Sequence, residues 1–149
     1  MIGSVVLTPD QLNAIEAAAL KALPRECCGL IVGRRTAEQC VVVSRIVESA
    51  NRTDGDPTST FEIDPAVHIH WQRTLRDTGE ELIGVYHSHP SSPPVPSDRD
   101  ARDVTIDGWV WLITAVDGDG QCRTGAYVAH LRPEASGTFT PATLVLADA

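Results

Sequence analysis

Short apolar runs separated by polar turns predict a series of strands along the chain. The run at 39–49 is dense in β-branched residues, which is typical of a sheet interior. The tail at 138–149 is expected either to add a last edge strand or to fray. The other predicted strands cover residues 5–7, 28–33, 60–63, 81–87, 109–116 and 122–130.

Helical spacing of apolar residues predicts three helices between these strands. The first covers about 9–23, and Thr8 and Gln11 form a capping box at its start. A second is expected over 65–79, with a glycine as its stop, and a third over about 97–107. Helices and strands mix without strict alternation, so the expected fold class is α/β (α+β), a mixed sheet with helices packed on it.

Length and composition indicate one globular domain. No repeat, linker or low-complexity tract divides the 149 residues, so a single domain spanning 1–149 is expected. Hydrophobic residues make up 42% and charged residues 21% of the chain, which is ordinary for a globular protein. The four cysteines have no zinc-ribbon spacing and are expected to be reduced thiols.

Charge and the absence of targeting signals restrict the partners. A formal net charge of −8 repels phosphate backbones, which argues against a nucleic-acid partner. No apolar run approaches the roughly 18 residues of a membrane span, so no membrane contact is expected. The N-terminus lacks the basic and apolar regions of a signal peptide, so the expected location is cytoplasmic.

Two histidines one residue apart stand at the end of the predicted strand at 81–87. Because side chains two apart on a strand point the same way, His87 and His89 can converge on one ion. A proline-rich loop with little backbone freedom follows, and Asp100 then arrives in the first turn of the next predicted helix. Two imidazoles, one carboxylate and an open position are typical of a catalytic zinc site, so the sequence predicts Zn²⁺ bound by these three residues.

Each part of this pattern also has a structural interpretation. A single His-x-His pair is more often a surface or packed pair than a metal site. Ser97 can simply cap the helix, and Asp98, Asp100 and Asp103 can be acidic residues favoured near a helix start. The complete spacing, His-x-His followed after seven residues by Ser and after two more by Asp, favours the metal site.

Other histidines are expected to be structural. His68 and His70 form a second His-x-His pair inside a predicted helix, where residues two apart diverge by about 200°. Their rings are therefore expected not to share a metal, and one of them is expected to be partly buried against Trp71. His130, at a strand end, is expected to have a structural role.

The HSHP stretch at 87–90, Ser97 and Asp100 match the JAMM signature, so the chain resembles the MPN+ metalloproteases (JAB1/MPN/Mov34). The resemblance covers roughly residues 5–130 through the stretches RECCGLIVG, FEIDP and ELIGVYHSHP. It implies a sheet sandwiched between helices, similar to cytidine deaminases. Deaminase chemistry itself is not expected, because its H-x-E and P-C-x-x-C motifs are absent.

This resemblance also implies residue roles and a substrate. Glu26 would be the catalytic base and the Ser97 hydroxyl would stabilise the oxyanion beside the zinc ion. The compact chain resembles prokaryotic members that hydrolyse an amide bond at the C-terminal diglycine tail of a ubiquitin-like or sulfur-carrier protein, and such a tail is expected to pair with a sheet edge. Cys27 is either a fourth metal ligand or, the preferred interpretation, points away from the site while Cys28 packs in the sheet.

Two alternative functions remain open. One is a non-catalytic MPN-type scaffold, although such proteins lose the metal ligands that this chain retains. The other is a cell-wall or phage-type JAMM peptidase, although no NlpC/P60-type domain accompanies this one. The sequence leaves the oligomeric state, the identity of the carrier and the pathway undetermined.

Overall fold

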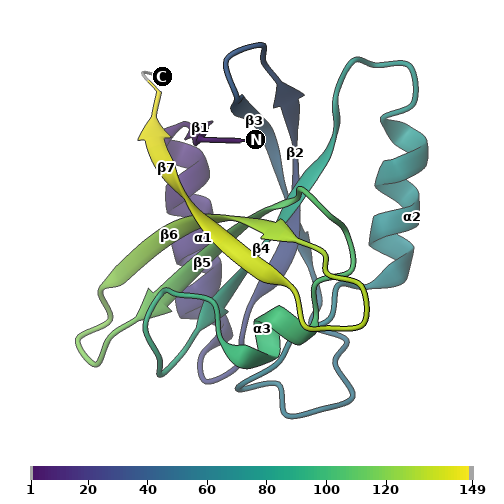
Figure 1. Ribbon diagram of the computed structural model, residues 1–149. Coiled ribbons are helices and arrows are strands. Elements are labelled where there is room, and N and C mark those ends of the chain that lie inside the picture. The colour runs from purple at the N-terminus through teal and green to yellow at the C-terminus, as the bar shows by residue number, and fades with distance from the viewer. Residues whose placement is uncertain (1, 148–149) are drawn as a thin grey trace.

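The computed structural model describes residues 2–147, which form seven strands and three helices (Figure 1). The predicted domain 1–149 also includes residues 1 and 148–149, which lie outside the described part, and its extent stays a prediction. The strands are β1 (Ser4–Leu7), β2 (Cys28–Arg35), β3 (Cys40–Ser49), β4 (Glu81–His89), β5 (Val110–Val116), β6 (Cys122–His130) and β7 (Thr138–Leu146). The helices are α1 (Pro9–Ala22), α2 (Pro65–Thr74) and α3 (Asp98–Arg102).

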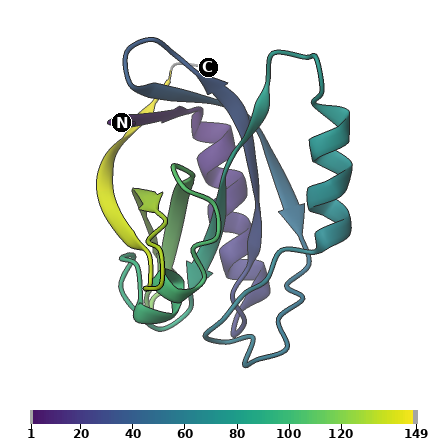
Figure 2. The ribbon, with the colours of Figure 1, turned by 45° about the vertical axis from the view of Figure 1, so that its right-hand side comes forward.

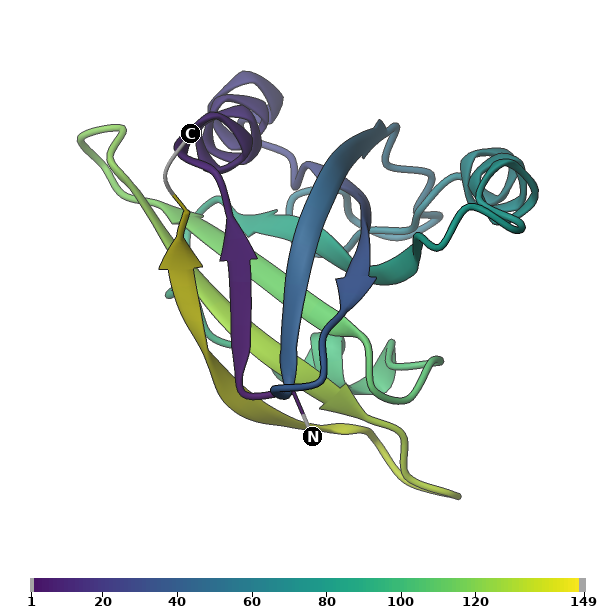
Figure 3. The same cartoon turned by 90° about the horizontal axis from the view of Figure 1, so that it is seen from above.

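The strands close on themselves in the order β1-β3-β2-β4-β5-β6-β7. Figure 3 shows this ring of strands from above. β7 completes it, because it pairs antiparallel with β6 and parallel with β1. The mixed α+β class is confirmed, but the predicted edge strand at 138–149 is paired on both sides within its described residues. Closure depends on contact with the N-terminal strand, which no local pattern in the tail encodes.

Two apolar clusters occupy the two faces of the central strands β2, β4 and β5. The first cluster lies between these strands, β1, β3 and α1, where Ile15 of the helix is fully buried. In the second, Leu30, Val85 and Trp111 pack with Trp71 of α2. α1 and α2 therefore pack on opposite faces of the central strands, and Figure 2 shows α2 separated from α1 by β2 and β3. Helices flank both faces of these strands, although the sheet as a whole is a closed barrel.

Most predicted strands are recovered, and apart from the end of the last one their limits shift by at most two residues. The capping box at the start of α1 is present: the Thr8 hydroxyl accepts the Gln11 N–H, and the Gln11 side chain accepts the Thr8 N–H. The predicted strand at 60–63 is wrong, because only an isolated bridge between Asn51 and Ile63 forms there. A tight turn precedes it, in which the carbonyl of Asp56 accepts the N–H of Thr60.

Two helices are shorter than predicted. α3 has five residues in place of about 97–107, because the β-branched residues at 104–106 disfavour a helix and Val104 is buried in the second cluster. α2 ends at Thr74, before the predicted stop, and Gly79 adopts a φ of 82° in the following turn. Within residues 2–147, no helix has both the length and the apolar character that a membrane crossing needs.

The close pairing of β4 and β5 requires a glycine at position 84. A Cβ atom added to Gly84 would overlap with the carbonyl oxygen of Val110. Because that oxygen belongs to the backbone of a central strand, Gly84→Ala should lower the free energy of unfolding by about 2–3 kcal/mol, measured by urea denaturation. Gly118→Ala is the matched control, since nothing lies within 4 Å of its Cβ position. An equal loss in both variants would contradict this packing.

Candidate metal centre

β4 carries His87 and His89 on the face that it turns toward the second apolar cluster. At His87, β4 pairs with β2 on one side and with β5 on the other, and this residue has no exposed surface. The Phe61 ring stacks on it at a centroid distance of 4.3 Å, and Trp111 contacts it edge-on at 5.5 Å. These rings restrict the orientation of the His87 imidazole.

The proline-rich loop after β4 is anchored through its carbonyl groups. His89 Nδ1 lies 2.7 Å from the carbonyl oxygen of Pro93, and the Tyr127 hydroxyl donates to the carbonyl oxygen of Pro94 at 2.7 Å. The loop is thus attached both to the end of β4 and to β6. This attachment determines where α3 begins.

Ser97 caps α3 and orients Asp100. The Ser97 hydroxyl accepts the Asp100 N–H, and the Ser97 N–H donates to Asp100 Oδ2, both at 3.0 Å. The capping interpretation of Ser97 is confirmed, and its role as an oxyanion donor stays a prediction. Since a hydroxyl accepts and donates at the same time, capping leaves the Ser97 proton available for another group.

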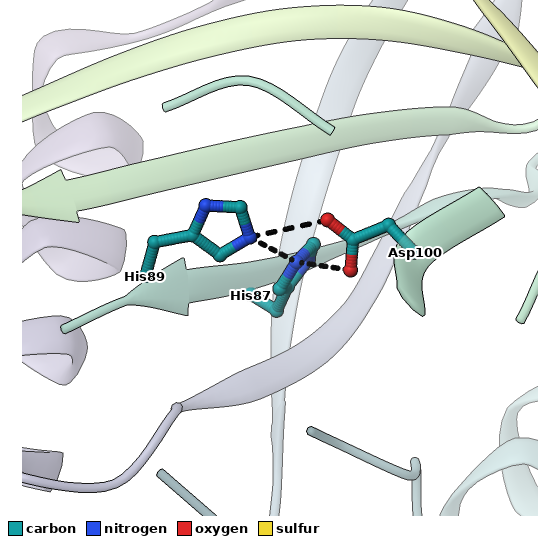
Figure 4. Close-up of side chains that lie close together, drawn as sticks. All are labelled: His87, His89 and Asp100. Atoms are coloured by element: carbon teal, nitrogen blue, oxygen red, sulfur yellow. Dashed lines mark hydrogen bonds and ion pairs between the residues drawn. The ribbon is translucent and has the colours of Figure 1, made fainter. Parts of the chain in front are cut away.

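The three predicted ligands lie together, as Figure 4 shows. His87 Nε2 is 3.0 Å from Asp100 Oδ1, and His89 Nε2 is 3.1 Å from Asp100 Oδ2. The two Nε2 atoms are 3.2 Å apart. All three residues are buried, and the candidate ligand atoms lie within 4.8 Å of one another. The cluster has the composition and spacing of a metal site.

The tautomer of His89 suits a metal ligand. A carbonyl oxygen only accepts, so Nδ1 of His89 must donate to Pro93, and in the neutral ring the Nε2 lone pair is then free. A tetrahedral zinc ion with Zn–N near ~2.0–2.1 Å separates two nitrogen ligands by about 3.3 Å, close to the spacing of the two Nε2 atoms. The donor set therefore fits a divalent cation of the zinc type.

Hydrogen bonding keeps Asp100 ionised in this buried cluster. Burial would raise its pKa, but the hydrogen bonds from His87, His89 and the Ser97 N–H hold that pKa well below its usual range. Burial lowers the pKa of His87, which favours the neutral ring. Burial would also lower the pKa of His89, but its bonds to Asp100 and to Pro93 outweigh this and raise it. A cation binding to His89 would have to displace that proton.

Glu26, just before β2, reaches the cluster from a distant part of the chain. It is 4% exposed, and its Oε1 atom has no hydrogen-bond partner within residues 2–147. Burial raises its pKa to about 7; the nearby charge of His89 lowers this pKa, and that of Asp100 raises it. The structure therefore places Glu26 within electrostatic range of the predicted ligands, and its role as a base stays a prediction.

The remaining histidines lie elsewhere. His68 is half-buried on α2 and contacts the ring of Trp109 at a centroid distance of 5.7 Å. The prediction that the partly buried histidine of the pair packs against Trp71 is therefore wrong. His70 is exposed and lies edge-on to Trp71. His130, at the end of β6, lies 2.9 Å from the Thr140 hydroxyl. None of these rings belongs to the cluster around Asp100.

The four cysteines are free thiols. Cys28 is buried in the sheet, and its Sγ faces the carbonyl oxygens of Ser49 and Ala50. Cys27 packs against the first apolar cluster, whereas the metal ligands face the second. Burial also raises the pKa of Cys27 to about 11, which disfavours the thiolate that a metal would need. These observations favour the interpretation in which Cys27 is not a ligand.

A cavity of about 530 Å³ adjoins the cluster. Phe61 and Trp111, the two rings that contact His87, form part of its lining together with Trp109. Arg99 and Arg102 of α3 line it from another side. The sequence interpretation missed these aromatic residues as part of the site. The only local signal was Phe61 in the FEIDP stretch, and the contact of Trp111 with His87 arises from strand pairing.

Comparison with known proteins gives a family match over most of the chain. The family model for prokaryotic homologues of the JAB domain matches residues 8–125. The desampylase of Haloferax volcanii is 32% identical over 95 residues, which cover 64% of this chain and 66% of that protein. The probable TtuB-protein conjugate cleaving protease of Thermus thermophilus is 30% identical over 102 residues, covering 68% and 64%. The chain thus spans slightly less than two thirds of the length of these relatives.

A solved structure agrees over nearly the whole chain. The solution structure of a protein from Desulfitobacterium hafniense superposes with a TM-score of 0.77 at 26% identity, covering 96% of this chain and 94% of that one. The matched range, residues 8–125, contains Glu26, His87, His89 and Asp100.

Removal of the Asp100 charge should weaken metal binding. We expect Asp100→Asn to raise the zinc dissociation constant more than about 100-fold, since a directly coordinating group is lost. Competition with a chromophoric chelator measures this constant. Asp98→Asn makes the same carboxylate-to-amide change at an exposed position of the same helix and should leave zinc affinity within about threefold. Equal affinity of Asp100→Asn and wild type would contradict the ligand assignment.

Glu26 should make the metal-free protein less stable as pH rises. Its folded-state pKa of about 7 exceeds its ordinary value of 4.5, so its favourable contribution is fully present below 4.5 and is lost as pH rises through 7. Glutamine does not titrate. In the presence of a chelator, the free energy of unfolding of Glu26→Gln should therefore rise relative to that of wild type by up to about 3 kcal/mol between pH 4.5 and 8. Urea denaturation across this range measures the difference, and a difference that does not change with pH would contradict the buried carboxyl.

Proposed function

The chain belongs to the prokaryotic JAB-domain family, and from this we propose that it is a zinc-dependent metallopeptidase. Its proposed reaction is hydrolysis of an amide bond at the C-terminal diglycine tail of a ubiquitin-like or sulfur-carrier protein. One observation carries the proposal: His87 Nε2, His89 Nε2 and the Asp100 carboxylate converge in one buried cluster. Glu26 lies beside it with an unpaired carboxylate oxygen.

The proposed mechanism assigns a separate task to each group. His87, His89 and Asp100 would hold the zinc ion, which when bound would supply a Lewis acid that lowers the pKa of water toward ~7. Glu26 accepts a proton from the attacking water as its oxygen bonds to the carbonyl carbon. The Ser97 hydroxyl donates to the oxyanion that develops on the carbonyl oxygen. Glu26 then passes its proton to the departing amine as the carbon–nitrogen bond breaks.

The environment of Glu26 supports its proposed role. An ordinary carboxyl group, with a pKa near 4.5, is a weak base at neutral pH, whereas burial raises the pKa of Glu26 to about 7. Its Oε1 atom is buried and makes no hydrogen bond within the described residues, so no other group competes for a proton there. The same carboxyl can therefore accept a proton and release it again within one reaction.

The proposed substrate rests on the relatives and on the shape of the site. The Thermus thermophilus relative is named for cleaving conjugates of TtuB with proteins. The cavity of about 530 Å³ is lined by Phe61 and Trp111, the rings that contact His87, and we propose that it receives the extended tail of the substrate. Glycines would pass these rings more easily than residues with side chains. Because the described strands form a closed barrel, we propose that the tail lies in this cavity, in place of the expected pairing with a sheet edge.

Glu26→Gln tests the proposed reaction. The variant should retain zinc, because Glu26 is outside the ligand set, and should lose about 10²–10⁴-fold in kcat, because an amide does not accept the proton. Release of a fluorescent amine from the C-terminus of a diglycine-ended carrier protein measures turnover, and mass spectrometry measures zinc. Glu38→Gln, at an exposed position between β2 and β3, is the matched control and should cleave normally.

Two outcomes would contradict separate parts of the proposal. Normal cleavage by Glu26→Gln would show that the base is another residue. Cleavage by wild type that is equally fast when the diglycine is replaced by dialanine would show that the tail does not select the substrate as proposed.

A further inference from the structure

The backbone around Glu26 is held on two sides. The Glu26 N–H donates to the carbonyl oxygen of Pro57 at 2.7 Å, and the Glu26 carbonyl accepts from Asn51 Nδ2 at 3.2 Å. On the other side, the Cys27 N–H donates to Ser88 Oγ at 2.8 Å, and the Ser88 N–H donates to the Cys27 carbonyl at 3.2 Å. The polar backbone groups of both residues are therefore all paired.

The carboxyl group of Glu26 lacks such support at Oε1. That atom is buried and has no hydrogen-bond partner in the described part of the chain. Its position relative to His89 and Asp100 therefore depends on where the backbone of Glu26 is held. Side chains that hold this backbone are candidates for a role in catalysis without touching the substrate.

Asn51 is the best candidate for this role, because its side-chain amide uses its full hydrogen-bonding capacity. Nδ2 donates to the carbonyl oxygens of Glu26 and Thr60 at 3.2 and 2.9 Å. Oδ1 accepts the N–H groups of Thr53 and Glu62, both at 3.1 Å. The network also defines the orientation of the amide. If its oxygen and nitrogen were exchanged, the oxygen would face two carbonyl oxygens and the nitrogen would face two N–H groups.

The residues that Asn51 joins belong to two different parts of the site. Thr53 and Glu62 line the cavity of about 530 Å³, as does Phe61 between them. Glu26 lies on the other side of the amide, beside the metal cluster. Asn51 therefore connects the segment that forms a wall of the cavity with the proposed base.

We propose that Asn51 is a positioning residue that holds Glu26 in line for proton transfer, an inference that rests on the proposed function. Displacement of a reacting group by about 1 Å can cost on the order of 10²-fold in rate. Asn51 is neither one of the ligands nor one of the residues that line the cavity, so its loss should lower kcat by more than it changes zinc affinity or KM.

Asn51→Asp is the sharpest test. It keeps an acceptor oxygen for the N–H groups of Thr53 and Glu62, but it sets a second oxygen against the carbonyls of Glu26 and Thr60. The expected result is a 10- to 100-fold lower kcat, with KM and the zinc dissociation constant within about threefold of wild type. Thr58→Val is the matched control: it removes a side-chain hydrogen bond to Asp56 in the same loop, at an exposed position whose hydroxyl is not bonded to Glu26.

Amide hydrogen exchange of the zinc-loaded protein gives a second measurement that is independent of activity. The Glu26 N–H should exchange at least about tenfold faster in Asn51→Asp, because its bond to Pro57 depends on the same loop. The Cys27 N–H, bonded to Ser88, is the internal reference and should keep its protection. Asn51→Ser, which leaves a gap in place of a half-buried carboxylate, is the second variant if Asn51→Asp does not fold.

The outcomes separate this inference from the proposed function. Unchanged kcat and unchanged Glu26 exchange would overturn the role of Asn51, as would an equal kcat loss in Thr58→Val or a loss explained by weaker zinc binding. If wild type cleaves no diglycine-ended carrier, the proposed function fails, and the exchange of the Glu26 N–H alone then decides whether Asn51 holds that segment.

Discussion

A charged carboxylate of α3, buried against the end of β4, is the constraint on which the rest of this structure depends. Asp100 is only 3% exposed and stays ionised, which would be costly without compensating partners. Its partners come from two segments: the rings of His87 and His89 on β4, and the N–H of Ser97 at the start of α3. The short helix, the anchored proline loop and the end of the strand are thus organised around one side chain.

The alternation of side chains along β4 gives its two faces different tasks. His87 and His89 face the second apolar cluster and the aromatic rings of Phe61 and Trp111. Ser88, between them, is fully buried on the other face and pairs with the backbone next to Glu26. Three consecutive residues therefore place both the candidate ligands and the segment of the candidate base, so a shift in strand register would disrupt both together.

Local signals were sufficient for most of the strands and helices and for the spacing of the cluster. The capping box at Thr8 and the His-x-His pair depend on neighbouring residues, and the structure brings His87, His89 and Asp100 together as expected. Glu26 was found through the resemblance to a family, since no local pattern marks a lone glutamate. Trp111 and Asn51 were missed, because their contacts arise from strand pairing and loop closure between segments far apart in the chain.

Pairing of the last strand with the first has a consequence for self-association. In an open sheet, the outer strands present unpaired N–H and C=O groups to which another molecule can add. Here β7 covers such groups on both β1 and β6. Detachment of β7 would expose two unpaired strand edges at once. This strand therefore protects the folded molecule from self-association.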